Sequence, residues 1–129
     1  KTGRLRGRGS AGVDHAEFEA VVRDVVAQLP DWVHDALDNI ELLVEDEAGP
    51  GVEADGEQLL GLYVGTPLPE REANHAGELP DIIYIYRLPH IDMALAPAAL
   101  RDEIATTIVH EIAHYFGIDD RKLHELGWG

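Results

Sequence analysis

The stretch PAALRDEIATTIVHEIAHYFG, residues 97–117, decides the fold because it combines a helix start, a long apolar ladder and a helix stop. Proline suits the first turn of a helix, where its missing N–H costs no hydrogen bond, so Pro97 marks the start. The ladder places one isoleucine at every fourth position, namely Ile104, Ile108 and Ile112. Gly117 is a natural left-handed terminator. We therefore predict one long helix that packs an apolar stripe against the rest of the molecule.

Within this helix, the sequence HEIAH at residues 110–114 places two histidines one turn apart. At about 100° per residue, His114 falls roughly 40° and Glu111 roughly 100° from His110, while the apolar stripe falls beyond them. The two imidazoles and the carboxylate are thus expected on the face opposite the core. Two histidines at this spacing can bind one zinc ion, and a glutamate beside the first can take a proton from water on the metal. The pattern predicts a Zn²⁺ site with His110 and His114 as ligands and Glu111 as the general base.

Shorter elements are expected before this helix. Asp14 and Glu17 form a capping-box pattern, and apolar residues follow at helical spacing. We predict helices at 14–29 and 31–37, strands at 40–44, 59–64 and 81–87, and a proline-rich loop between the last two strands. The predicted fold class is α/β (α+β): a small, mostly antiparallel sheet packed on the 97–116 helix and on the N-terminal helix.

Composition limits the partners. The chain has 129 residues, 45% of them hydrophobic, which suffices for one modest core. Its net charge of −15 repels phosphates and anionic lipids, so we expect neither nucleic acid nor a membrane as a partner. No apolar run approaches the roughly 20 residues that cross a bilayer, and we expect a cytoplasmic protein. Residues 1–12, with four basic side chains, are expected to form a flexible tail before a single domain at 13–129.

Composition also narrows the chemistry. The chain has no Cys, and its one Ser, Ser10, lies in the expected tail. Neither a Cys–His nor a Ser–His–Asp arrangement is therefore plausible. Metal-assisted hydrolysis, with the ion held by His, Asp or Glu side chains, is the chemistry that remains.

Residues 110–120 fit the pattern HExxHxxGxxD, which resembles the metzincin-type motif in its variant with Asp as the third ligand. More broadly, residues 18–128 resemble the small bacterial zincin-like metallopeptidases, on the segments LGLYVGTPL at 60–68, LPDII at 79–83 and the region 110–128. The resemblance implies His110, His114 and Asp120 as zinc ligands and Glu111 as general base. It also implies a third strand packed on the active-site helix, and a peptide or protein substrate. Metzincins have a Met-containing turn after the motif, whereas the single Met of this chain, Met93, precedes it.

Two alternatives stay open from the sequence. His124 is the competing third ligand, because an imidazole is a good zinc donor and the segment after Gly117 could fold back to the metal. The chain could also be a catalytically silent zincin-fold module that binds a metal or a protein partner. The remaining histidines lack ligand spacing and are predicted to be surface or hydrogen-bonded core residues: His15, His34, His75 and His90.

Overall fold

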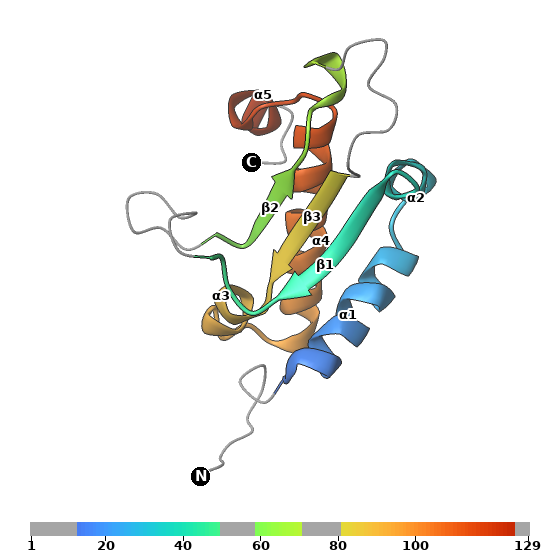
Figure 1. Ribbon diagram of the computed structural model, residues 1–129. Coiled ribbons are helices and arrows are strands. Elements are labelled where there is room, and N and C mark those ends of the chain that lie inside the picture. The colour runs from blue at the N-terminus through green and yellow to red at the C-terminus, as the bar shows by residue number, and fades with distance from the viewer. Residues whose placement is uncertain (1–12, 50–58, 71–80, 126–129) are drawn as a thin grey trace.

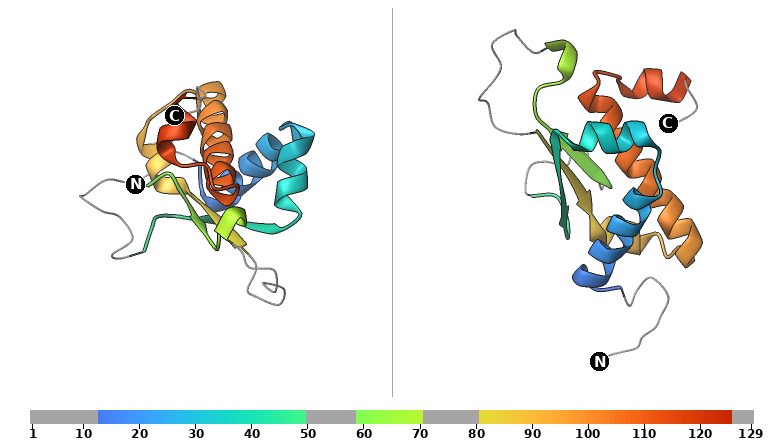
Figure 2. Two further views of the ribbon diagram at one scale, coloured as in Figure 1. Left: turned by 90° about the horizontal axis from the view of Figure 1, so that it is seen from above. Right: turned by 90° about the vertical axis from the view of Figure 1, so that its right-hand side faces the viewer.

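The computed structural model describes residues 13–49, 59–70 and 81–125. A three-stranded sheet forms one layer, and the helices α1, α2 and α4 cover one of its faces (Figures 1 and 2). The predicted α/β class is therefore confirmed. The tail predicted at 1–12 lies outside the described residues.

The N-terminal layer contains α1 (His15–Ala27) and α2 (Asp31–Leu37). The predicted capping box is present: Glu17 N–H donates to the Asp14 carboxylate at 2.9 Å, and the Glu17 carboxylate accepts from Asp14 N–H at 3.2 Å. Helix α1 buries Phe18, Val22 and Val25. The observed helix bounds differ from the predicted ones by at most two residues, because the caps and Pro30 define where the helices start and stop.

The sheet is mixed, which corrects one detail of the prediction. Its strands are β1 (Ile40–Glu45), β3 (Asp81–Tyr86) and β2 (Gly61–Val64), in that spatial order. β2 pairs antiparallel with β3, but β1 pairs parallel with it. The consecutive strands β1 and β2 do run in opposite directions, as a mostly antiparallel sheet requires. However, β3 inserts between them and so meets one neighbour in each orientation.

A short helix that the sequence did not predict follows β3. α3 (Arg87–Asp92) begins where the strand was predicted to continue, at Arg87. Its start is held by tertiary contacts: the Arg87 guanidinium donates to Asp46 at 2.9 Å and to the Val13 carbonyl at 2.7 Å. This pairing also holds the pKa of the Asp46 carboxyl below its ordinary value. Because these partners are distant in sequence, local periodicity does not reveal them.

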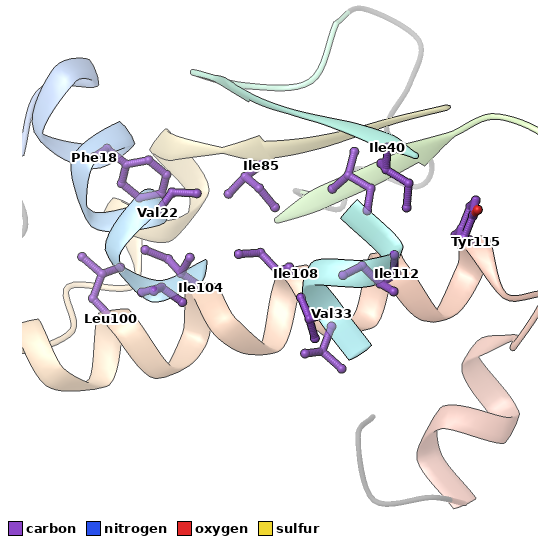
Figure 3. Close-up of a cluster of buried hydrophobic side chains, with 14 residues drawn as sticks. Phe18, Val22, Val33, Ile40, Ile85, Leu100, Ile104, Ile108, Ile112 and Tyr115 are labelled. Atoms are coloured by element: carbon purple, nitrogen blue, oxygen red, sulfur yellow. The ribbon is translucent and has the colours of Figure 1, made fainter. Parts of the chain in front are cut away.

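Helix α4 (Pro97–Tyr115) contacts β2, β3 and α1 and provides one side of the core. Ile104, Ile108 and Ile112 are 0% exposed, and they point toward the layer that contains Phe18, Ile85 and Ile40 (Figure 3). Fully burying such a side chain stabilises the fold by about 1.5–3 kcal/mol. The ladder therefore fixes the rotation of α4 about its own axis, and with it the direction in which the HExxH residues point. Among the described helices, none has the length and apolarity to cross a membrane.

Candidate metal centre

The predicted histidines meet near the C-terminal end of α4. The ring centroids of His110 and His114 lie 4.8 Å apart, with the rings nearly perpendicular. One ligand atom from each of His110, Glu111 and His114 can be chosen so that all lie within 4.8 Å of one another. Both imidazoles are partly exposed, whereas the carboxylate is buried. Helical spacing alone thus brings together three of the predicted site residues.

Glu111 does not lie on the solvent-facing side of α4, which corrects the helical-wheel prediction. Only 7% of this residue is exposed, because β2 crosses α4 above it. Gly61 lies at this crossing, where an added Cβ would lie 3.3 Å from Glu111 Cγ and 2.7 Å from Thr107 Cγ2. A glycine inside a strand often marks such a close approach, so Gly61 was the available sequence signal.

The buried carboxylate is hydrogen-bonded to one of the histidines. Glu111 Oε1 lies 3.2 Å from His114 Nδ1. When Nδ1 carries the imidazole proton, it donates to this oxygen, and Nε2 then has the lone pair that metal ligation requires. Glu111 can therefore fix the orientation and tautomer of His114. Two imidazoles beside a carboxylate match the nitrogen and oxygen donors that zinc binds, so the residues present fit this ion.

The chain reverses sharply after α4, as the sequence predicted. Gly117 has φ +83°, and two backbone bonds close the helix end: Gly117 N–H to His114 O and Ile118 N–H to Ala113 O, both at 2.9 Å. This is a Schellman motif, in which the left-handed residue satisfies the last carbonyls of the helix. The reversal leads directly into a second short helix.

That helix is α5 (Asp120–Glu125), which the sequence did not predict. Its start is stabilised by Asp119, whose carboxylate accepts from Lys122 N–H at 2.9 Å. Asp120 is the first residue of α5, three positions after Gly117, and its side chain lies outside the described part of the structure. His124 lies in the last turn, where it is exposed. Among the described side chains, His124 does not join the cluster of His110, Glu111 and His114.

An open pocket of about 220 Å³ adjoins His114. It is lined by Pro67, Glu70, His114, Gly117, Ile118 and Asp119. The first two come from the segment after β2, which was expected to be loop and which contains the short 3-10 helix η2 (Leu68–Glu70). The pocket was missed because it forms only when η2 packs on the end of α4.

The other described histidines lie away from the cluster. His90 is 0% exposed and hydrogen-bonded at both ring nitrogens, to the Tyr86 carbonyl at 2.7 Å and to Thr107 Oγ1 at 2.9 Å. Burial lowers its pKa below the ordinary value of 6.5. The prediction of a hydrogen-bonded core histidine is confirmed for this residue. His75 lies outside the described residues.

Comparison with known proteins agrees with this geometry. Residues 37–128, well over half of the chain, match the family described as zincin-like metallopeptidases. The chain therefore belongs to the zincin-like metallopeptidase family, which confirms the resemblance carried by its motif. A conserved hypothetical protein from Thermo thermophilus has a similar structure, with a TM-score of 0.56 and 23% sequence identity over 88% of this chain and 97% of that one. At this identity the likeness shows a shared fold. No curated protein matches the chain.

Proposed function

We propose that this protein is a zinc-dependent peptidase that hydrolyses peptide bonds with a water molecule as the nucleophile. The observation that carries the proposal is the grouping of His110, Glu111 and His114 at one end of α4, with the carboxylate buried and the imidazoles accessible. A zinc-binding module without catalysis needs only the ligands. The covered carboxylate beside them is what hydrolysis additionally requires.

His110 and His114 are proposed as two zinc ligands, with Asp120 as the third. The first two stand one helical turn apart on a helix fixed by its buried ladder. Asp120 is favoured over His124 because it lies only three positions after the reversal at Gly117, whereas His124 lies in the last turn of α5. When bound, zinc supplies Lewis-acid chemistry: it makes water more acidic and polarises a carbonyl oxygen.

Glu111 is proposed as the general base and acid. Its carboxylate accepts the proton of the attacking water and returns it to the leaving amine nitrogen, so the proton is held on Glu111 between the two steps. Gly61 lies against the Glu111 side chain, and only 7% of this residue is exposed to solvent. Its carboxylate oxygen Oε1 lies 3.2 Å from His114 Nδ1, so the proposed base stands beside the imidazoles, where the proton is needed.

The test begins with the metal. The purified chain should contain about one zinc per molecule by elemental analysis, and His110→Ala or His114→Ala should lose it. His34→Ala, at a half-buried histidine of α2, is the matched control and should keep it. Wild-type zinc content in both ligand variants would refute the proposed metal site.

The second arm tests catalysis on a library of quenched fluorescent peptides. Glu111→Gln should keep zinc and lower turnover by about 10² or more, because it retains the shape but removes the proton acceptor. Glu41→Gln, on the exposed face of β1, should leave turnover unchanged. Stoichiometric zinc with no cleavage of any peptide would leave the protein a metal-binding module and end the peptidase proposal.

A further inference from the structure

The pocket beside His114 lies next to the candidate metal cluster. His114 belongs both to the candidate metal cluster and to the lining of the pocket. A side chain bound there would belong to a residue next to the reacting peptide bond. The chemistry of the other lining residues therefore bears on which peptides the site accepts.

The lining combines an apolar wall with a carboxylate. Pro67 and Ile118 are half-buried and present hydrocarbon, while the Glu70 side chain is exposed. The second acidic residue, Asp119, already uses one carboxylate oxygen to cap α5. Within residues 13–49, 59–70 and 81–125, Glu70 forms no ion pair, so no neighbour in these segments neutralises its charge.

Glu70 is held at this place by the packing of η2. Its backbone N–H donates to Pro67 O at 2.9 Å, which closes the short helix. The Pro69 ring lies against Gly117 so tightly that a Cβ on Gly117 would come within 2.6 Å of Pro69 Cγ. The segment that carries Glu70 thus rests directly on the end of the helix that carries His114.

We infer that Glu70 determines specificity and that the pocket accepts a lysine or arginine side chain of the substrate. A long alkyl stem that ends in a cation matches an apolar wall with a carboxylate, because such side chains bury their stem and keep the charge at a polar edge. An acidic side chain would instead meet Glu70 and a net charge of −15. This inference rests on the proposed peptidase function and names its substrate class.

The experiment measures peptide binding apart from cleavage. Zinc-loaded Glu111→Gln protein is titrated with fluorescent peptides of an alanine–glycine background that carry Arg, Gln or Glu at each position in turn. We expect one position at which Arg binds about two- to fivefold more tightly than Gln, the range of an exposed ion pair. Adding Glu70→Gln should remove this preference, and adding Glu70→Lys should reverse it in favour of Glu.

The matched control is Glu41→Lys in the same background, which changes the net charge as Glu70→Lys does but lies on the exposed face of β1. Equal loss of the Arg preference in both Lys variants would mean that overall charge alone attracts the peptide, and would overturn the role of Glu70. Equal affinity for the Arg, Gln and Glu peptides at every position in the Glu111→Gln protein would also overturn the role of Glu70. Cleavage by the otherwise unchanged chain is measured in parallel. Cleavage without a basic preference refutes this inference alone, whereas Glu70-dependent binding of Arg peptides without cleavage refutes the peptidase proposal alone.

Discussion

A single methyl group added at Gly61 should lower both the stability and the turnover of the protein but leave its zinc content unchanged. In Gly61→Ala the new Cβ would lie 2.7 Å from Thr107 Cγ2, 3.0 Å from the Tyr84 carbonyl oxygen and 3.3 Å from Glu111 Cγ. Because the first of these distances is too short for real side chains, either Thr107 must rotate out of its hydrogen bonds to His90 and to the Glu103 carbonyl, or β2 and α4 must shift apart. Such overpacking costs about 1–3 kcal/mol. For a chain of 129 residues this lowers the Tm by roughly 3–12 °C.

The same shift moves the proposed base. A displacement of Glu111 by a fraction of an ångström should lower turnover by about 10-fold, since catalysis depends steeply on the position of the reacting groups. Zinc content should be unchanged because neither imidazole is among the atoms nearest the added methyl. Thermal unfolding by circular dichroism, elemental analysis and the peptide assay measure the three quantities. Gly49→Ala is the control, because an added Cβ there meets no atom of the described residues within 4 Å.

A second substitution tests the cause. Thr107→Ser removes the methyl that a Cβ at Gly61 would strike, but it keeps the hydroxyl that pairs with His90. The double variant should therefore be more stable than the sum of the two single effects allows, by about 0.5 kcal/mol or more. The reasoning is refuted if Gly61→Ala melts and turns over like Gly49→Ala, or if the double variant shows simple additivity.

Three further predictions concern ligands and protons. Asp120→Ala should weaken zinc binding by well over 100-fold, which is more than the loss of a residue that only hydrogen-bonds to a ligand causes. His124→Ala should change zinc affinity little. Competition with a chelator measures both affinities, and the opposite order would make His124 the ligand. Burial lowers the pKa of His90 below 6.5, so the unfolded chain binds the proton more readily, and the free energy of unfolding should fall as pH drops below about 6.5. Urea unfolding at several pH values should show a smaller dependence of this free energy on pH in His90→Gln. An unchanged pH dependence would contradict the prediction. The hydrogen bond from Arg87 lowers the pKa of Asp46, so its stabilisation is present above 3.8 and is lost as pH falls through the lower value in the folded state. Acid unfolding followed by circular dichroism should therefore begin at higher pH in Arg87→Gln, and coincident curves would remove this pair from the acid response.

The elements that the sequence predicted well carry their signals locally. Pro97, the isoleucine ladder and Gly117 define α4, and the spacing within HEIAH places the histidines without any tertiary information. The same is true of α2, which begins directly after Pro30. These features depend on backbone geometry over one or a few turns, which a single sequence expresses directly.

The features that the sequence did not predict depend on contacts between distant segments. The position of β3 between β1 and β2 is set by pairing across the sheet, and the residue pattern of one strand does not indicate which strand it pairs with. The burial of Glu111 requires β2 to cross α4, and the only sequence signal for this crossing was the glycine within the strand, Gly61. Helix α3 has six residues and is held by Arg87 contacts up to 74 positions away, too short and too nonlocal for a periodic signal.

One helix carries both core residues and the candidate metal ligands, so metal binding at these histidines would be linked to folding. The isoleucines of α4 hold the hydrophobic core on one side while His110 and His114 project from the same turns. The unfolded chain does not hold these imidazoles together, so any zinc that binds the folded state shifts the folding equilibrium toward it. At a free zinc concentration 100 times the Kd, the gain is about 2.7 kcal/mol. The melting temperature of the purified protein should therefore rise with zinc concentration, so calorimetry can measure the affinity of the site before any substrate has been identified.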